Sequence, residues 1–196
     1  MKSKLAQACV LVGVGLVCGV VIAQQARPDK KAIAAELQKI SAPAAEHRNF
    51  DPFLGSFDEE IEYEGGGGQP VLIEGDASGQ WVLGNRFLEL NAHADMSEQV
   101  KFESIAYFGY NTQKKKYFVV GLDTGGTYPV YAEGDYDASK KTWTLYGEND
   151  EPGVGRIPIK FVIQVNDKGA ITQEIFTKVA GADGYQKIAK TVFKRK

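Results

Sequence analysis

The chain has 196 residues, a formal net charge of −2 at pH 7, two cysteines and 43% hydrophobic residues. A chain of this size can bury a substantial core within one domain. Its slight acidity argues against nucleic acid or an anionic membrane as a partner, because those partners favour a basic face.

The N-terminal segment has the pattern of a secretory signal peptide. Lys2 and Lys4 precede the run Ala8–Ala23, in which every residue is apolar, glycine or cysteine. This pattern predicts cleavage after Ala23, so that the mature chain begins at Gln24 and is exported to the periplasm or the extracellular space. An uncleaved membrane anchor is the alternative, although the run is short for a transmembrane helix, which needs about 20 apolar residues.

Both cysteines, Cys9 and Cys18, lie within the predicted signal peptide. Val17 stands where a lipidated Cys18 would need a small residue, which disfavours a lipoprotein. The mature chain is therefore predicted to have no disulfide, no thiol nucleophile and no thiolate metal site. Loss of Lys2 and Lys4 from the 23 basic residues leaves 21 against 25 acidic residues, a net charge of −4. We therefore expect no nucleic-acid partner and, after cleavage, no membrane partner.

Residues 24–53 differ in character and are predicted to form an N-terminal helical leader. Ile33, Leu37 and Ile40 lie at positions i, i+4 and i+7 of one helix face, and Pro43 ends the pattern. The simpler interpretation is an amphipathic helix that rests on the domain or tethers it loosely. A helix that binds a partner protein is the alternative.

Residues 54–196 form one strand-like run after another, without helical periodicity. The predicted strands are 54–64, 71–83, 86–93, 100–110, 116–123, 127–137, 142–149, 156–166, 170–180 and 184–195. Ten closely spaced strands with short links predict an all-β fold, a single antiparallel up-and-down β-barrel. Closure of such a barrel removes the exposed sheet edges.

Two turns in this region are nearly copies of each other. Residues 110–117 and 136–143 both have an aromatic residue, Asn or Asp, two variable positions, two lysines, one variable position and a second aromatic residue. Asn111 and Asp137 can each bond to the backbone two residues further on, which starts a type I turn. The repeat therefore indicates antiparallel hairpins.

The segment 171–179 alternates in a way that predicts one buried face. Gln173 and Thr177 lie on that face among apolar residues. Either these two polar side chains form local hydrogen bonds, or they line a cavity.

Gly84-Asn85 predicts another hairpin, which sets Trp81 opposite Leu88 and gives Arg86 the same face as Trp81. If that face is the inner one, Arg86 needs an acidic partner or a ligand. An ion pair and a ligand-anchoring role both remain open. The candidate acidic partners are Asp123, Glu133 and Glu174.

A barrel of this strand number can enclose one small ligand. We expect a small apolar or amphipathic molecule with an acidic or polar end, held by large aromatic side chains and a few directional polar groups. The competing interpretation is that the aromatic side chains simply fill the barrel. The predicted ligand-binding residues are Trp81, Arg86, Tyr107, Tyr131, Trp143 and Gln173.

Four sequence blocks carry a resemblance to a known family. They are Trp81–Leu88, Phe108–Tyr117, Glu133–Asp137 and Phe193–Lys196. In their order and spacing, across about residues 50–196, these blocks resemble the bacterial domain-of-unknown-function family 1579. The resemblance implies a lipocalin-like barrel without an assigned activity. It also implies a Gly-x-Trp motif on the first strand, whose aromatic ring packs against an arginine of the last strand. The counterparts here are Gly55-Ser56-Phe57 and Arg195, so this sequence departs from the motif by having phenylalanine, a weaker cation–π platform, in place of tryptophan.

No catalytic or metal-binding motif stands out. The mature chain has two histidines, His47 and His93, and it lacks a Gly-x-Ser-x-Gly elbow, a His-Glu-x-x-His motif and zinc-ligand spacing. We therefore expect no cofactor and no metal. A haem-binding barrel is disfavoured, because haem needs an axial ligand, usually histidine, and none follows His93. The remaining alternatives to ligand binding are a filled, structural barrel and an enzyme that uses buried carboxylates such as Asp123 or Glu133.

Overall fold

The computed structural model describes residues 29–64, 69–97, 100–151, 153–178, 181 and 183–196. The predicted signal peptide lies outside these residues. The chain divides into two units, Met1–Ser41 and Ala42–Lys196.

The first unit contains α1, the helix Lys30–Ile40, which confirms the helix predicted in the leader. The side chain of Asp29 caps α1 by accepting a hydrogen bond from the backbone N–H of Lys31 (3.3 Å). No residue of α1 is buried, and the apolar side chains of Ile33 and Ile40 are exposed. Within the described ranges, no helix is long and apolar enough to span a membrane.

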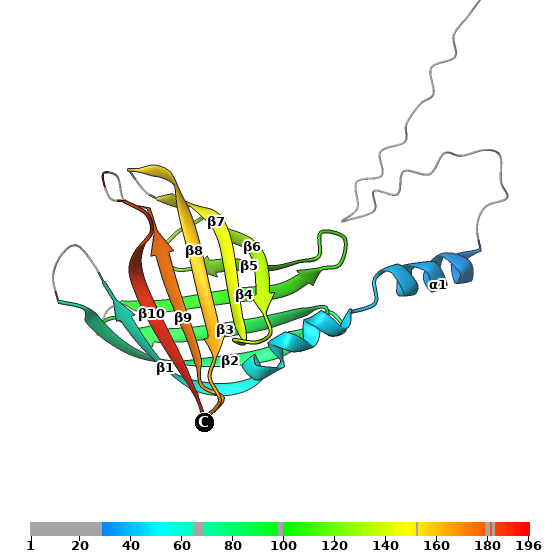
Figure 1. The fold of residues 1–196 in the computed structure, drawn as a ribbon. Coiled ribbons are helices and arrows are strands. Elements are labelled where there is room, and N and C mark those ends of the chain that lie inside the picture. The colour runs from blue at the N-terminus through cyan, green and yellow to red at the C-terminus, as the bar shows by residue number, and fades with distance from the viewer. Residues whose placement is uncertain (1–28, 65–68, 98–99, 152, 179–180, 182) are drawn as a thin grey trace, which may run out of the picture. The chain divides into compact units, whose positions relative to one another are not determined.

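The second unit is a closed barrel of antiparallel strands, as predicted (Figure 1). Each strand pairs with the next along the chain, and β1 also pairs with β10, so the sheet has no open edge. The strands are β1 (Gly55–Tyr63), β2 (Val71–Val82), β3 (Phe87–Asp95), β4 (Lys101–Asn111), β5 (Lys116–Asp123), β6 (Val130–Asp137), β7 (Thr142–Glu151), β8 (Gly155–Val165), β9 (Ile171–Thr177) and β10 (Gln186–Arg195).

Alternate residues of each strand face the inside of the barrel. On β1 the inward residues are Phe57, Glu59 and Ile61, and their neighbours in sequence face outward. Across the seam with β10, Glu59 lies opposite Phe193. The register predicted for the hairpin of β2 and β3 is also present, since Trp81 pairs with Leu88.

The strand connections alternate between the two ends of the barrel, and the end that carries the turns after β2, β4, β6 and β8 is tightly built. Asn111 Oδ1 accepts hydrogen bonds from the backbone N–H groups two and three residues further on (3.0 and 2.9 Å). Asp137 Oδ1 does the same in the second copy of the turn (3.0 and 3.4 Å). Lys115 and Lys141, at equivalent positions, both have positive φ values (54° and 49°). The predicted Asn and Asp turns are therefore confirmed.

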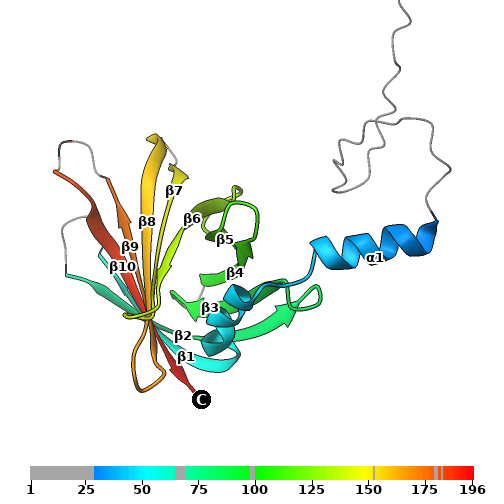
Figure 2. The same cartoon turned by 45° about the vertical axis from the view of Figure 1, so that its right-hand side comes forward.

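A 3-10 helix, η1 (Ala45–Phe53), closes this end of the barrel and contacts β2, β3 and β4 (cyan in Figure 2). Phe50 of η1 stacks on Trp143 with ring centroids 5.2 Å apart, and Phe53 stacks on Phe108 at 5.3 Å. These four rings are at most 1% exposed. Burial of each such side chain contributes about 1.5–3 kcal/mol, so η1 is an integral part of the barrel core. Although η1 falls within the predicted leader, it belongs to the same unit as the barrel.

Arg195 on β10 lies at the same end and links three parts of the chain. Its guanidinium carbon lies 5.1 Å from the centroid of the Phe57 ring, which is the pairing that the family resemblance implies. Its Nη1 and Nη2 donate hydrogen bonds to the carbonyl oxygens of Leu54 (2.6 Å) and Pro52 (2.9 Å). Arg195 thus joins the last strand both to the first strand and to the end of η1.

Candidate functional site

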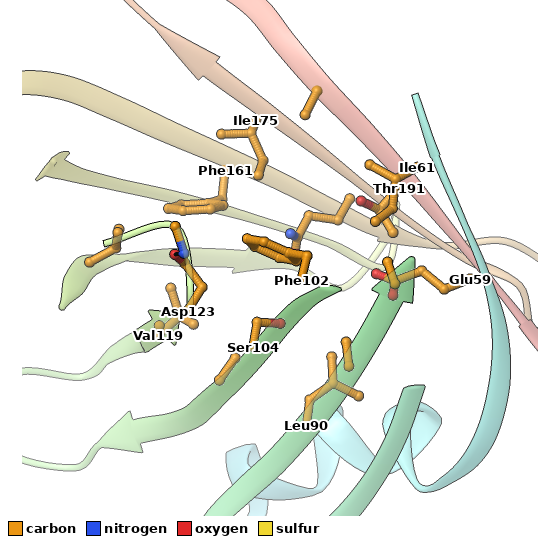
Figure 3. A pocket seen from close by; sticks show the side chains of 18 of the residues that line it. Glu59, Ile61, Leu90, Phe102, Ser104, Val119, Asp123, Phe161, Ile175 and Thr191 are labelled. Carbon is orange, nitrogen blue, oxygen red and sulfur yellow. Dashed lines mark hydrogen bonds between the residues drawn. The ribbon is translucent and has the colours of Figure 1, made fainter. Parts of the chain in front are cut away.

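The half of the barrel that faces away from η1 is hollow. A cavity of about 490 Å³ lies there, and every one of the ten strands contributes to its lining. Figure 3 shows Leu90, Ser104 and Val119 on one wall, with Phe161 and Ile175 on the opposite wall. The volume falls within the range of roughly 300–1,000 Å³ that is typical of small-molecule sites.

The cavity has a sealed floor and an open mouth. Phe108 and Phe193 form part of its floor, and both are buried in the same core cluster as the η1 rings. The lining residues Tyr63, Met96 and Leu122 are 47%, 51% and 44% exposed, which places them at the mouth. A ligand would therefore enter at the end opposite η1.

One carboxylic acid is buried in the cavity wall. Glu59 on β1 is 6% exposed, and Figure 3 shows its side chain pointing from β1 into the cavity. Burial, together with the negative charge of Asp76, raises the pKa of the Glu59 carboxyl from an ordinary 4.5 to about 7. Its Oε2 has no hydrogen-bond partner among the described residues. Such an atom is costly to bury, because water no longer solvates it and no protein donor replaces the water.

The remaining polar lining is sparse and carries no positive charge. Across the described residues, the lining has no lysine, arginine or histidine, and its second carboxylate is Asp123 at the mouth. Asp123 is exposed, and its Oδ1 accepts a hydrogen bond from the backbone N–H of Gly125 (2.8 Å). Asn149 Oδ1 is a second buried oxygen of the lining without a partner in the described part of the chain. Two buried oxygens of the lining, Glu59 Oε2 and Asn149 Oδ1, thus lack a hydrogen-bond donor among the described residues.

Of the six predicted ligand-binding residues, Gln173 on β9 lines the cavity. Thr177, the other polar residue on that face, bonds locally, because its hydroxyl donates to the carbonyl oxygen of Pro158 (3.0 Å). The sequence left open whether these two residues line a cavity or form local hydrogen bonds. Gln173 lines the cavity, and Thr177 forms a local hydrogen bond.

The two tryptophans lie at the packed end of the barrel and do not line the cavity. Trp143 is fully buried in the core cluster, and Trp81 packs against that cluster. The indole N–H of Trp81 donates a hydrogen bond to Asp51 Oδ1 of η1 (3.0 Å). Aromatic residues therefore fill the interior at the η1 end of the barrel, whereas the interior at the mouth end is hollow.

The prediction that Tyr107 and Tyr131 face inward is wrong. Tyr131 is 44% exposed, and its hydroxyl donates to Glu133 Oε2 (2.7 Å). Tyr107 lies across from Glu89 and shares a side-chain hydrogen bond with it, on the face away from the cavity. On β4 and β6 the inward positions are even-numbered, and Tyr107 and Tyr131 occupy odd-numbered ones.

The prediction that Arg86 points into the barrel is also wrong. The strands end at Val82 and Phe87, so Arg86 belongs to the turn between them. Its Nη1 donates to the carbonyl oxygens of Leu83 (3.0 Å) and Gly84 (3.3 Å). Three consecutive positive φ values, at Leu83, Gly84 and Asn85, lift this residue out of the strand register.

The two carboxylates proposed for acid–base chemistry are not buried. Asp123 is exposed at the mouth. Glu133 faces outward, where a hydrogen bond from Lys114 Nζ (2.8 Å) and one from Tyr131 hold the pKa of its carboxyl below the usual range. Neither Asp123 nor Glu133 is therefore the buried carboxylate that the enzyme alternative requires.

The two histidines and the acidic side chains of the described residues do not gather into a metal-binding cluster. The described part of the chain contains no cluster of three or more histidine, cysteine, aspartate or glutamate side chains that could hold a metal ion. His93 faces outward, 3.9 Å from Glu103, and His47 lies in η1, where its Nδ1 accepts a hydrogen bond from the backbone N–H of Ala44 (3.0 Å). Neither histidine lines the cavity.

The sequence did not lead to Glu59, the buried carboxylic acid of the cavity wall. A signal for it exists, because Glu59 alternates with the apolar residues Phe57 and Ile61 on one face of a strand. The acidic neighbours Asp58, Glu60 and Glu62 conceal that signal, since the whole strand reads as an acidic surface.

Comparisons with known proteins agree with this fold. Residues 42–195 match the family described as "Protein of unknown function (DUF1579)". Thirteen chains of solved structures match, among them the crystal structure of Rv2717c from M. tuberculosis. That protein is 14% identical to this chain with a TM-score of 0.57, and the match covers 79% of this chain and 99% of that one, so the likeness shows the fold alone. No curated protein matches the chain significantly.

Proposed function

We propose that this chain, which belongs to the DUF1579 family of proteins of unknown function, binds a small, largely apolar ligand without transforming it. The closed barrel provides the interior space for such a ligand. The observation that carries this proposal is the 490 Å³ cavity, with mostly apolar walls and an exposed rim. Protein interiors are normally close-packed, so an interior hollow of this size is suited to a ligand.

A variant that fills the cavity tests the proposal, and Gly121 on β5 offers the position for it. Gly121 lines the cavity, and an added Cβ would meet no atom closer than the Cβ of Val130 at 3.9 Å. By contrast, a Cβ on Gly134 or Gly147 would come within 2.0 Å or 1.9 Å of a backbone oxygen. Gly121→Phe therefore puts a ring into the cavity while the strand backbone stays in place.

The experiment measures binding of Nile red by its emission and binding of decan-1-ol by the melting temperature. Both ligands should bind the wild type, and a ligand at 100 times its Kd stabilises the folded state by about 2.7 kcal/mol. Gly121→Phe should weaken both by at least about tenfold, which is about 1.4 kcal/mol of binding free energy. The matched control is Val120→Phe, which adds the same ring to the outer face of the same strand and should bind like the wild type.

Two results would overturn the proposal. One is a wild-type protein that binds neither the dye nor the alcohol. The other is undiminished binding to Gly121→Phe, which would place the bound molecules elsewhere on the protein.

A further inference from the structure

We infer that the ligand is an apolar molecule with a protonated amine, and that its ammonium group pairs with the carboxylate of Glu59 inside the cavity. This inference rests on the proposed function and names the chemical class of ligand for the same site.

The first argument is the unmet hydrogen-bonding need of Glu59. Its Oε2 is buried without a partner in the described part of the molecule, although it belongs to a carboxylic acid in an apolar wall. The cross-strand neighbours of Glu59 are Gly75 on β2 and Phe193 on β10, and neither has a side chain that can donate a hydrogen bond. A donor supplied by the ligand would remove this cost.

The second argument is the charge around Glu59. The titratable side chains in the described lining are Glu59, Tyr63 and Asp123, and none of them is a cation. β10 faces Glu59 with Thr191 and Phe193, and the charge that acts on Glu59 from β2 is the negative one of Asp76. A ligand with a negative end would enter a field of its own sign, whereas an ammonium group would be attracted. Its N–H groups would form charge-assisted hydrogen bonds with the carboxylate, which are stronger than neutral ones.

The third argument is the kind of atom that lacks a partner. Two oxygens of the lining lack a donor among the described residues, Asn149 Oδ1 and Glu59 Oε2, and the latter accepts hydrogen bonds once the carboxyl is ionised. The sequence predicts an acidic end for the ligand because of Arg86, but Arg86 lies in the β2–β3 turn. A ligand that brings donors thus matches the cavity better than one that brings acceptors.

Binding of an ammonium group has a defined proton balance. In the free protein the Glu59 carboxyl, with a pKa of about 7, is mostly protonated at pH 6 and mostly ionised at pH 8. The bound ammonium stabilises the ionised form, so binding at pH 6 releases the carboxyl proton to the buffer. Amine affinity should therefore rise between pH 6 and pH 8, while the affinity of an uncharged ligand should stay nearly constant.

The test compares decan-1-amine, decan-1-ol and decanoate, which share one apolar chain and differ in the charge at its end. At pH 8 the amine should bind about tenfold more tightly than the alcohol, and decanoate more weakly than both. Glu59→Gln should abolish the advantage of the amine and leave the alcohol nearly unaffected. Glu60→Gln is the matched control, because Glu60 neighbours Glu59 on β1 but is exposed and pairs with Lys194.

Calorimetry in two buffers of different ionisation enthalpy supplies an independent readout on the wild type. It should detect nearly one proton released per amine bound at pH 6 and little release at pH 8. This measurement decides the question even if Glu59→Gln does not fold.

The outcomes separate the two proposals. If the alcohol binds as tightly as the amine, if decanoate binds best, or if no proton is released at pH 6, the amine inference is overturned while apolar ligand binding stands. If none of the three binds the wild type, the proposed function fails and the inference fails with it.

Discussion

Glu59 should make the stability of this protein depend on pH in a direction that is unusual for a carboxylic acid. Burial raises the pKa of Glu59 in the folded protein to about 7, against 4.5 in the unfolded chain. Between these two pH values the folded state holds a proton that the unfolded state has given up. Stability is therefore highest below pH 4.5 as far as this group is concerned, and it falls as the pH rises through 7.

The size of the effect follows from the difference between the two pKa values. A difference of about 2.5 in pKa, at about 1.36 kcal/mol for each, gives a total penalty of about 3 kcal/mol. About 2.5 kcal/mol of this penalty develops between pH 5 and pH 8. For a domain of this size it corresponds to a melting-temperature difference of roughly 5–10 °C.

Glu59→Gln isolates this contribution, because glutamine has nearly the same shape and stays uncharged. Urea unfolding of both proteins at pH 5 and pH 8 should show the variant gaining about 2.5 kcal/mol relative to the wild type as the pH rises. Glu60→Gln, on the exposed face of the same strand, should show no comparable change. If the difference between wild type and Glu59→Gln is the same at both pH values, Glu59 is not the buried, protonated group described above.

Three further predictions concern the closed end, haem and export. Arg195→Ala should lower the free energy of unfolding by about 1–3 kcal/mol, since it removes two hydrogen bonds to the carbonyl oxygens of Leu54 and Pro52 and the contact with the Phe57 ring. Lys196→Ala should change it by less than about 1 kcal/mol, and equal losses in urea unfolding would contradict this. Added haemin should give no sharp Soret band, because His47 and His93 do not line the cavity, and a band that survives replacement of both histidines would refute the axial-ligand reasoning. We also propose export, so the intact mass of the protein from the envelope of its native host should correspond to a chain that begins at Gln24, and a full-length, membrane-extracted chain would favour an anchor instead.

The parts of the fold that follow local rules were predictable from the sequence. Asn111 and Asp137 form their turns because the interaction lies between a side chain and a backbone only two or three residues away. The strand register of the Trp81–Leu88 pair follows equally from a short turn. These features depend on few residues, so a pattern of residue types suffices to find them.

The outward orientation of Tyr107 and Tyr131 could not be predicted from such local patterns. On β6 the inward positions are Val130, Ala132, Gly134 and Tyr136, and a Cβ on Gly134 would come within 2.0 Å of the carbonyl oxygen of Thr144. The close approach of β7 thus leaves no room for a side chain at Gly134, and Tyr131 lies on the outer face, stacked with Phe118 at 6.3 Å. The rule that bulky aromatic residues face inward fails for Tyr131, because Val130 and Ala132 on either side of it face inward and successive residues of a strand point to opposite faces.

The role of η1 was equally hidden, for a different reason. Its segment contains Pro52 and shows no regular apolar spacing, so it resembles a linker. Phe50 and Phe53 gain their function only from rings on β4 and β7 that are far away in the sequence. The floor of the cavity therefore depends on tertiary contacts that no local pattern reveals.

The seam between β1 and β10 governs when during synthesis this protein can acquire its structure. Arg195 meets the carbonyl oxygen of Leu54 across 141 residues of sequence, and β1 has no second neighbour until β10 has been made. Joining such distant segments carries a large loop-closure cost that is repaid only when the remaining strands are in place, so folding is expected to be slow and late. A nascent chain could therefore not close the barrel before β10 has been made, which would suit the export proposed above, because a secretory channel threads an unfolded polypeptide.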